Sequence, residues 1–295
     1  MRFPFLPSLL AIVCVLSAVG FAADPAPQTA TNTLTDLVFD NIDYKSGDSL
    51  TDYEKTRCKL DLYLPVSGDN FPVLVWFHGG GLTGGAKDGV KSIAQRFAHE
   101  GIAVAAVNYR LSPKATYPAY LDDAAAAVAW VKAHAAEHHL DAARVFVGGH
   151  SAGAYLAYMV GLDDRWLKPY HLDPSAIAGL IPVSGQILTH YTIREERGIK
   201  DHNLVFADED APINHVHKDT PPCLILYADK DMVGRREGNA FLAVSLRAAG
   251  NKHVRDLLIE NRTHGSIAGN MVHPGDPAAE AIVHFIADPK SASSN

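Results

Sequence analysis

Cysteine is scarce in this sequence, with 3 residues among 295, and runs of Lys or Arg are absent. So little cysteine excludes a fold built on disulfides. The chain is mildly acidic, with 26 Lys and Arg against 33 Asp and Glu, so we expect neither a nucleic-acid partner nor attraction to an anionic membrane surface. Only 20% of the residues are charged and 47% are hydrophobic. This composition excludes disorder as the main state and supplies a large core.

The N-terminal segment has an apolar run at residues 9–19, which follows Arg2 and precedes small residues. This order is typical of a secretory signal peptide, and we place its cleavage after Ala22. An uncleaved membrane anchor is the alternative, but the run is shorter than the about 20 residues that a bilayer span needs. We therefore expect residues 1–22 to be a signal peptide and the mature protein to be exported, either secreted or periplasmic, without a membrane span. Residues 23–35, rich in Pro, Ala and Thr, predict a flexible leader.

From residue 36 onward, strand-like and helix-like segments alternate. Short apolar or alternating runs predict strands at Lys59–Leu64, Val73–Phe77, Ile102–Val107, Arg144–Val147, Ile177–Val183, Cys223–Tyr227 and Val254–Ile259. Segments with helical spacing predict helices at Leu121–His134, after Ser151, at Gly238–Ala249 and at Ala278–Ile286. The alternation predicts an α/β fold in residues 36–295, with a mostly parallel central sheet and helices on both faces.

Residues 186–222 break this alternation, since they show no clean period and scatter four histidines among charged residues. So long an irregular connection usually belongs to a binding site or a lid. We expect an insertion that is polar rather than apolar, too small for a second domain, beside a shallow and open pocket.

The motif G-x-S-x-G occurs at Gly149–Gly153, directly after a predicted strand and directly before a predicted helix. In that context the serine sits on a sharp turn that lifts its Oγ above the sheet. Glycines two residues on either side let neighbouring backbone approach without a Cβ clash. Ser151 is therefore the candidate nucleophile, and the N–H of Ala152 is placed where an oxyanion would form.

A second glycine-rich segment, His78–Gly81, follows the strand predicted at Val73–Phe77. Three glycines leave the backbone free to direct N–H groups at a negative oxygen, as the other half of an oxyanion hole does. A phosphate-binding loop is the alternative, but the Gly-Lys-Ser/Thr of a P-loop does not follow.

A serine nucleophile needs a base and an acid. Asp231 and Asp229 both follow the strand predicted at Cys223–Tyr227, where an acid would project, and we choose Asp231 with Asp229 as the fallback. His264 lies on a loop between the last predicted strand and the last predicted helix, which suits the base. The nearby alternatives among the fifteen histidines are His253 and His273.

Three other features receive a structural interpretation. His134–His138 fits the pattern H-x-x-E-H, but it ends an Ala-rich helix, so we favour a solvated polar face over a metal site. Cys58 and Cys223 lie in strand-like segments; an oxidising compartment permits a disulfide between them, yet buried free thiols are the favoured interpretation. Asp122 and Asp123 are expected to start a helix near the positive end of its dipole.

Taken together, the motifs resemble the α/β-hydrolase superfamily, specifically carboxylesterases related to hormone-sensitive lipase, in the feruloyl-esterase-like and kynurenine-formamidase-like branch. The residues that carry the resemblance are Lys59–Pro65, His78–Gly81, Asn108–Leu111, Gly149–Gly153, Asp231 and His264. It implies an α/β-hydrolase fold, with Ser151 as nucleophile, Asp231 and His264 as its partners, and the amides of Gly80, Gly81 and Ala152 as the oxyanion hole. Two departures from the family, the missing N-terminal cap and Leu82 in place of an aromatic residue, leave the acyl pocket undefined.

The expected activity is therefore that of a serine carboxylesterase acting on short-acyl or aryl esters through an acyl-enzyme, with no metal or organic cofactor. An amidase or formamidase using the same three residues is the alternative within enzymes. A non-catalytic binding module on this fold is a further alternative, which would require a missing triad member. The partner implied is a small-molecule ester.

Overall fold

The computed structural model describes Met1, residues 37–201 and residues 204–291. The predicted leader and, apart from Met1, the predicted signal peptide lie outside the described residues. Within the described part of the chain, no helix combines the length and the apolar character needed to cross a membrane.

One sheet of eight strands organises the described chain. The strands are β1 (Leu37–Asp43), β2 (Lys59–Leu64), β3 (Phe71–Phe77), β4 (Ala103–Val107), β5 (Leu140–His150), β6 (Gly179–Val183), β7 (Cys223–Lys230) and β8 (Val254–Thr263). They lie side by side in the order β1-β2-β4-β3-β5-β6-β7-β8. β2 runs antiparallel to β1 and β4, whereas all pairs from β4 to β8 are parallel. The carboxyl ends of the parallel strands therefore meet at one edge, where loops of distant sequence can converge.

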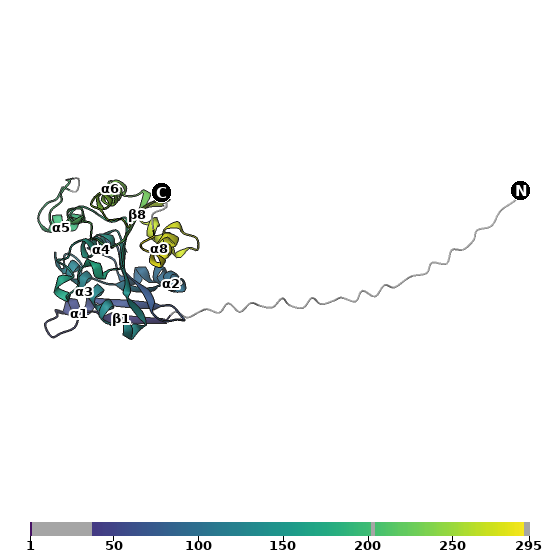
Figure 1. Cartoon of the computed structure of the whole chain (residues 1–295), viewed down its shortest axis with the longest axis horizontal. Coiled ribbons are helices and arrows are strands. Elements are labelled where there is room, and N and C mark those ends of the chain that lie inside the picture. Colours follow the sequence, from purple (N-terminus) through teal and green to yellow (C-terminus); the bar gives the residue numbers. More distant parts are fainter. Residues whose placement is uncertain (2–36, 202–203, 292–295) are drawn as a thin grey trace. The chain divides into compact units, whose positions relative to one another are not determined.

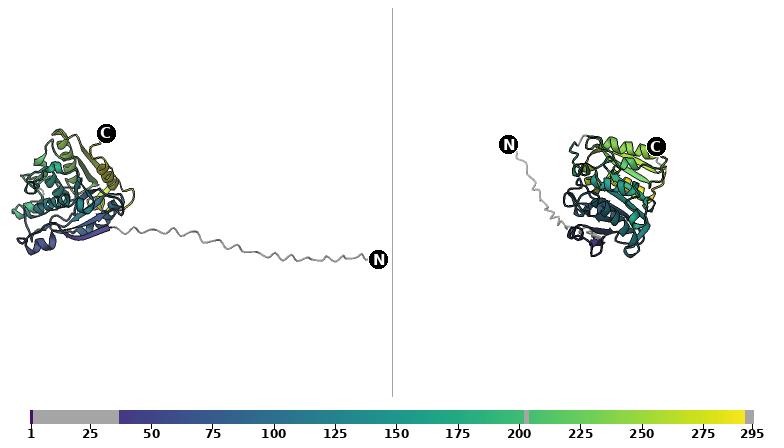
Figure 2. Two further views of the ribbon diagram at one scale, coloured as in Figure 1. Left: turned by 60° about the horizontal axis from the view of Figure 1, so that its bottom comes forward. Right: turned by 90° about the vertical axis from the view of Figure 1, so that its left-hand side faces the viewer.

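Helices cover both faces of the sheet (Figure 1 and Figure 2). The α-helices are α1 (Asp52–Arg57), α2 (Lys91–His99), α3 (Ala119–Ala133), α4 (Ala152–Leu162), α5 (Tyr191–Glu196), α6 (Arg235–Ala248), α7 (Ser266–Gly269) and α8 (Pro277–Ala287). Helices α2 and α8 pack on one face in one hydrophobic cluster, and α3, α4 and α6 pack on the other face in a second cluster. The predicted α/β fold with a mostly parallel, doubly covered sheet is confirmed.

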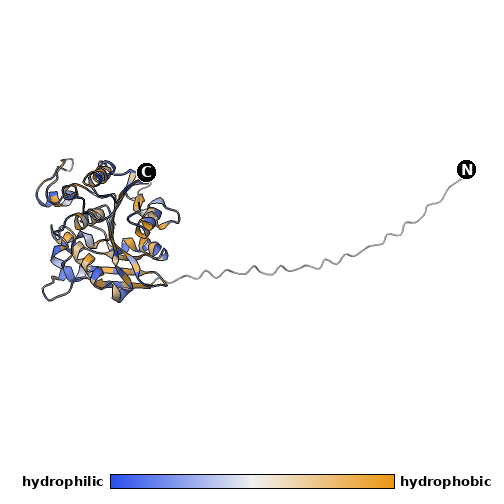
Figure 3. Cartoon of the chain, in the orientation of Figure 1, coloured by the Kyte–Doolittle hydropathy of each residue, from blue (hydrophilic) through white to orange (hydrophobic). Residues whose placement is uncertain are grey.

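Burial explains why the central elements form where they do. All residues of β4 are buried, as are six of the seven residues of β3, because helices cover both faces of these strands. Apolar residues accordingly concentrate along the sheet and the inner helix faces (Figure 3). All eleven residues of α4 are buried and none is charged, which is typical of a helix enclosed on every side. This helix holds the turn that carries Ser151 at a fixed place.

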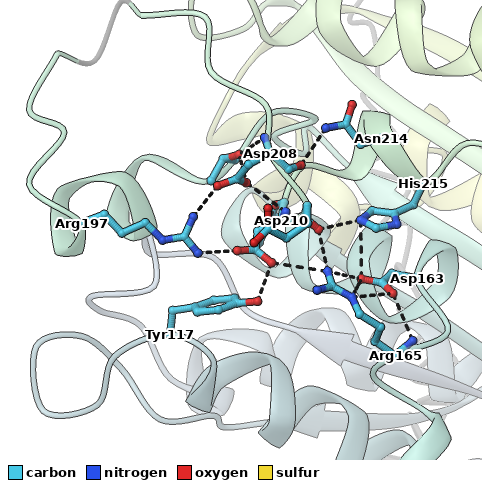
Figure 4. A network of polar contacts seen from close by, with 11 residues as sticks. Tyr117, Asp163, Arg165, Arg197, Asp208, Asp210, Asn214 and His215 are labelled. Atoms are coloured by element: carbon cyan, nitrogen blue, oxygen red, sulfur yellow. Dashed lines mark hydrogen bonds and ion pairs between the residues drawn. The ribbon is translucent and has the colours of Figure 1, made fainter.

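Residues 186–222 contain α5 and a short 3₁₀ helix, η5 (Pro212–His215), and the described residues between these two helices form irregular backbone. A polar network around the fully buried Asp210 anchors this segment (Figure 4). Asp210 accepts a hydrogen bond from Tyr117 Oη at 2.5 Å and pairs with the guanidinium groups of Arg197 and Arg165. Its carbonyl accepts from Tyr155 Oη in α4 at 2.8 Å. The insertion is therefore tied to the helices beneath it through charged and polar groups.

Cys58 and Cys223 are both free and buried, so no disulfide joins them. Burial raises the pKa of the Cys58 thiol to about 12, and a negative charge at Asp123 acts in the same direction. The predicted buried free thiols are confirmed.

Candidate active site

Ser151 lies on the turn between β5 and α4, at the carboxyl edge of the sheet. Its backbone has φ 57° and ψ −113°, a conformation that costs a non-glycine residue free energy and is often found at functional sites. The turn is packed so tightly that a Cβ on Gly153 would lie 2.0 Å from the carbonyl oxygen of Phe77. Only glycine fits there, which is the physical reason for the spacing G-x-S-x-G.

Ser151, His264 and Asp231 form one line of hydrogen bonds, although they come from three separate loops. His264 Nε2 lies 2.8 Å from Ser151 Oγ, and His264 Nδ1 lies 2.6 Å from Asp231 Oδ1. The Asp231 carboxylate accepts a hydrogen bond from the Nδ1–H of His264. The other ring nitrogen, Nε2, is therefore free to accept the proton of the serine hydroxyl. The structure thus brings together the three side chains that the sequence predicted, and their catalytic roles remain a prediction.

Asp231 has a fully buried side chain held by several donors. Ser184 Oγ donates to Asp231 Oδ2 at 2.5 Å, and the Met232 N–H donates to Oδ1 at 2.8 Å. Burial alone would raise the pKa of this carboxyl, but the hydrogen bonds from His264, Ser184 and Met232 outweigh burial and lower it to about 2. The carboxylate therefore stays ionised and fixed in orientation. Ser184 was not found from the sequence, because it belongs to another strand end.

Asp229, the fallback acid, shows no contact with His264 among the described residues. Its Oδ1 accepts the backbone N–H of Arg262 at 2.8 Å, and hydrogen bonds of this kind lower the pKa of this partly exposed group. The alternative bases are also placed apart: His253 carries a buried Nδ1 without a hydrogen-bond partner in the described chain, and His273 follows η6 (Asn270–Val272). Neither shows a contact with Ser151.

The predicted oxyanion hole lies beside the nucleophile. A Cβ on Gly79 would lie 3.4 Å from Ser151 Cβ, which shows how closely this loop approaches the serine. Gly80 and Gly81 both have positive φ, at 117° and 65°, and within the described chain neither N–H donates to another protein group. Ala152 is the first residue of α4, so its N–H has no partner inside the helix. Three N–H groups thus lack a protein partner of this kind in the described chain, and their role as an oxyanion hole remains a prediction.

A partly buried arginine and an aromatic ring support this loop. His78 stacks on Tyr109 with ring centroids 4.3 Å apart, and Tyr109 Oη donates to the His78 carbonyl at 2.7 Å. Arg57 lies 3.2 Å from His78 Nε2 and also donates to the Gly85 carbonyl. Burial lowers the pKa of His78 to about 4, so the ring stays neutral and accepts from Arg57. Arg57 was missed from the sequence, since no motif surrounds it.

Helix α5, in the irregular insertion, contacts the same loop. Thr192 Oγ1 donates to the Gly81 carbonyl at 2.5 Å. A Cβ on Gly81 would lie 1.9 Å from Tyr191 Oη, so the tyrosine packs directly against the glycine. The insertion therefore helps to fix the backbone whose N–H groups would face an oxyanion.

His150, next to the nucleophile, has a structural position against the candidate base. Its Nε2 lies 2.6 Å from the His264 carbonyl, and the two rings are 4.8 Å apart. Burial, with help from the nearby His264, lowers the pKa of His150 to about 4. A neutral His150 donates from Nε2 to that carbonyl and so fixes the loop of His264.

The pattern H-x-x-E-H does not form a metal site in the described chain. His134 stacks on Trp130 at 4.4 Å and lies 2.9 Å from the Trp130 carbonyl through Nδ1. Across residues 37–201 and 204–291, no group of three or more His, Cys, Asp or Glu side chains is arranged to hold a metal ion.

A mostly parallel sheet, a serine on a strained turn after β5 and a hydrogen-bonded Ser–His–Asp line define an α/β-hydrolase. Comparison with known proteins agrees. A family model described as BD-FAE matches residues 60–175. Esterase LipQ of Mycobacterium tuberculosis is 30% identical over 244 residues, which cover 74% of this chain and 56% of LipQ. The chain is thus an α/β-hydrolase whose sequence relatives are carboxylesterases, and the resemblance inferred from the motifs is confirmed.

Two solved structures show the same fold. A truncated carbohydrate esterase from gut microbiota aligns with a TM-score of 0.68 at 20% identity, covering 86% of this chain and 96% of that one. A thermophilic esterase of Thermogutta terrifontis with bound butyrate aligns with a TM-score of 0.65 at 22% identity, covering 86% of this chain and 96% of that one. The chain spans little more than half the length of LipQ, so its activity is a matter of proposal.

Proposed function

We propose that this chain is a serine carboxylesterase that hydrolyses short-acyl or aryl carboxylic esters through an acyl-enzyme. The observation that carries the proposal is the line Ser151–His264–Asp231 on a strained serine turn. Its relatives support it, since LipQ is an esterase and the Thermogutta esterase binds butyrate.

The first half of the reaction follows from the geometry. Ser151 Oγ attacks the ester carbonyl carbon while His264 Nε2 takes the hydroxyl proton over the 2.8 Å contact. The ionised Asp231 stabilises the imidazolium that forms. The N–H groups of Gly80, Gly81 and Ala152 bind the oxyanion, where the loss of one donor costs about 10² to 10³ in rate. When the intermediate collapses, His264 protonates the departing alcohol and leaves an acyl group on Ser151.

The second half repeats these roles with water as the nucleophile. His264 takes a proton from water, the resulting tetrahedral intermediate collapses, and Ser151 recovers its proton as the free acid leaves. Every proton and electron pair comes from the chain, the ester or water, so the proposed mechanism calls for no metal and no organic cofactor.

A substrate panel with one variant tests this function. We expect hydrolysis of 4-nitrophenyl acetate and of a feruloyl ester, and a rate at least about 10⁴-fold lower for Ser151→Ala, because no other group on the turn can form the acyl-enzyme. The exposed Ser175 provides the control variant Ser175→Ala, which keeps full activity. Ser151→Ala activity within tenfold of the parent would contradict the proposal, and a preference for N-formylkynurenine over the esters would show a formamidase instead.

We also propose that the protein is exported, with residues 1–22 removed. Arg2, the apolar run at residues 9–19 and the small residues before Ala23 support this. The N-terminal sequence of protein recovered from a secreting bacterial host should begin at Ala23. Full-length protein in the membrane fraction would contradict it.

A further inference from the structure

A cavity of about 470 Å³ lies between the loop after β6 and the start of α6. Its lining contains Gly185, Gln186, Ile187, Leu188, Tyr191, Arg194, Leu204, Val205, Met232, Val233, Gly234, Arg235 and Gly238. The cavity borders the candidate active site on two sides. Met232 directly follows Asp231, and Tyr191 packs against Gly81 of the predicted oxyanion hole. A substrate with its carbonyl at Ser151 would have this cavity next to it.

The charged side chains that line the cavity are all positive. Two arginines, Arg194 and Arg235, line the cavity, and none of the described residues around it is Asp or Glu. This is unexpected in a chain that has 33 acidic residues against 26 basic ones. Arg194 is directed toward backbone, since its guanidinium donates to the Leu204 carbonyl at 2.7 Å.

Arg235 is a buried cation that forms no ion pair in the described chain, although the Asp231 carboxylate lies near enough to act on its pKa. The residue is only 8% exposed, and the one hydrogen bond that its side chain makes in the described chain runs from Nη2 to Gln186 Oε1 at 3.2 Å. Its Nη1 is buried and has no hydrogen-bond partner among the described residues. Burying an unpaired charge is costly, so this guanidinium has unused capacity to bind an anion.

Other arginines of the chain show what a purely structural role looks like. Arg110 pairs with Asp123 at 2.8 Å, and Arg165 pairs with Asp163 at 2.6 Å. Arg197 pairs with Asp210. Each of these side chains has its acid in the protein, whereas Arg235 faces a cavity and a neutral amide. The missing anion is therefore expected from the ligand.

The other side chains that line the cavity indicate what chemical groups the rest of the ligand would carry. Ile187 and Leu188 give the cavity apolar walls, and Met232 and Val233, 50% and 104% exposed, stand at its edge. A guanidinium binds a carboxylate through two parallel N–H groups. The cavity thus fits a carboxylate attached to a short apolar or aryl body.

We propose that Arg235 binds a carboxylate carried by the ester substrate, so that the enzyme prefers esters bearing a second, anionic carboxyl group over their neutral counterparts. Half-esters of dicarboxylic acids and esters of aromatic hydroxy acids are the two forms of this class. The proposal rests on the proposed esterase function, and it adds the substrate class for the same site.

Two matched ester pairs test it. The acyl-side pair is 4-nitrophenyl hydrogen glutarate and its monoamide; the alcohol-side pair is 4-acetoxybenzoate and 4-acetoxybenzamide. We expect the kcat/KM of the anionic member to exceed that of the amide by at least about tenfold in one pair, chiefly through KM, since a charge-assisted hydrogen bond discriminates by this order. Arg235→Gln should reduce this ratio about tenfold or more, and Arg235→Lys, which keeps the charge, should retain part of it.

The adjacent Arg236 is exposed and gives the matched control. Arg236→Gln removes the same charge from the chain, so an unchanged ratio in this variant excludes a general effect of net charge. Equal loss of the ratio in the two glutamine variants, or no preference for the anionic member of either pair in the parent, would overturn the proposal.

A binding measurement separates the two proposals. Ser151→Ala protein is titrated calorimetrically with 4-acetoxybenzoate and with glutarate, alone and combined with Arg235→Gln or Arg235→Lys. Binding that weakens about tenfold in the glutamine variant supports the role of Arg235 even if the parent cleaves no ester. Ester cleavage by the parent together with binding indifferent to Arg235 would leave the esterase function standing and overturn the carboxylate site.

Discussion

At the scale of single residues, two carboxylates that lie two positions apart in the sequence, Asp229 and Asp231, have different surroundings. Asp231 is buried, receives hydrogen bonds from His264, Ser184 and a backbone N–H, and has a pKa of about 2. Asp229 is partly exposed and accepts the backbone N–H of Arg262 on β8. Both side chains are aspartates, so the position of Asp231 in the fold is what would allow it, and not Asp229, to orient His264.

Asparagine substitutions at both positions measure this difference. Asp231→Asn should lower kcat on 4-nitrophenyl acetate by about 10⁴-fold, because the amide no longer holds His264 in its productive tautomer. Asp229→Asn should change kcat less than about threefold. A larger loss in Asp229→Asn would show that the wrong carboxylate had been assigned.

The sequence predicted the residues of the site that belong to local motifs and missed those that act across the fold. Ser151 and Gly80 lie in motifs whose geometry is set within a few residues. Arg57 and Ser184 touch the site only because distant segments meet. Asp123 was expected to begin a helix favourably, yet α3 begins at Ala119 and Asp123 is fully buried between Arg110 and Lys45. Such long-range pairs leave no periodic pattern.

At the scale of elements, the predicted strands and helices were those with strong apolar signals. β3, β4 and α4 are enclosed by the rest of the fold, so their sequences are almost wholly apolar. Several elements without such a signal were missed, β1 and α2 among them. β1 is an edge strand with five exposed residues, and the buried apolar residues of α2 stand in pairs among charged and polar ones, so neither element shows a continuous apolar run.

The predicted start of α6 was also late. The expected helix began at Gly238, whereas α6 begins at Arg235. The first turn of a helix lacks internal hydrogen-bond partners for its N–H groups and carries a weak sequence signal. This displacement matters, because the missed turn contains the buried arginine.

The turn between β5 and α4 makes a prediction about stability. Gly153→Ala places a Cβ 2.0 Å from the Phe77 carbonyl oxygen, so backbone must move, and the free energy of unfolding should fall by about 2–4 kcal/mol. Gly269→Ala is the control, since its Cβ meets nothing within 4 Å and its φ is −59°. We expect a change below about 0.5 kcal/mol there. Equal urea midpoints for the two variants would contradict the described packing.

At the scale of the whole described molecule, the irregular insertion lines the cavity in which we propose that the substrate binds. The insertion was expected to be polar, and its anchoring network is polar. Its cavity-facing residues Ile187 and Leu188 are apolar, however, which the mixed sequence of this segment concealed. Its α-helix, α5, is only six residues long, and the neighbouring cavity contains a buried guanidinium.

A series of esters with acyl chains of different length tests this description of the cavity. Each added methylene contributes about 0.8 kcal/mol only where an apolar wall receives it, and a longer alkyl chain would remove water from Arg235 without replacing its hydrogen bonds. The kcat/KM on neutral 4-nitrophenyl esters should therefore peak between acetate and butyrate. A series measured below the micelle limit that peaks at decanoate or beyond would show a deep acyl channel instead.

The central claim is that Ser151 is a nucleophile activated by His264 and Asp231, and covalent labelling tests it most directly. The protein is treated with a fluorophosphonate, digested, and mapped by mass spectrometry, with Ser151→Ala and Asp231→Asn treated in parallel. The account predicts one label per chain on Ser151, no label in Ser151→Ala, and much slower labelling in Asp231→Asn. An unlabelled Ser151 in protein that hydrolyses esters, or a label on another serine, would contradict it.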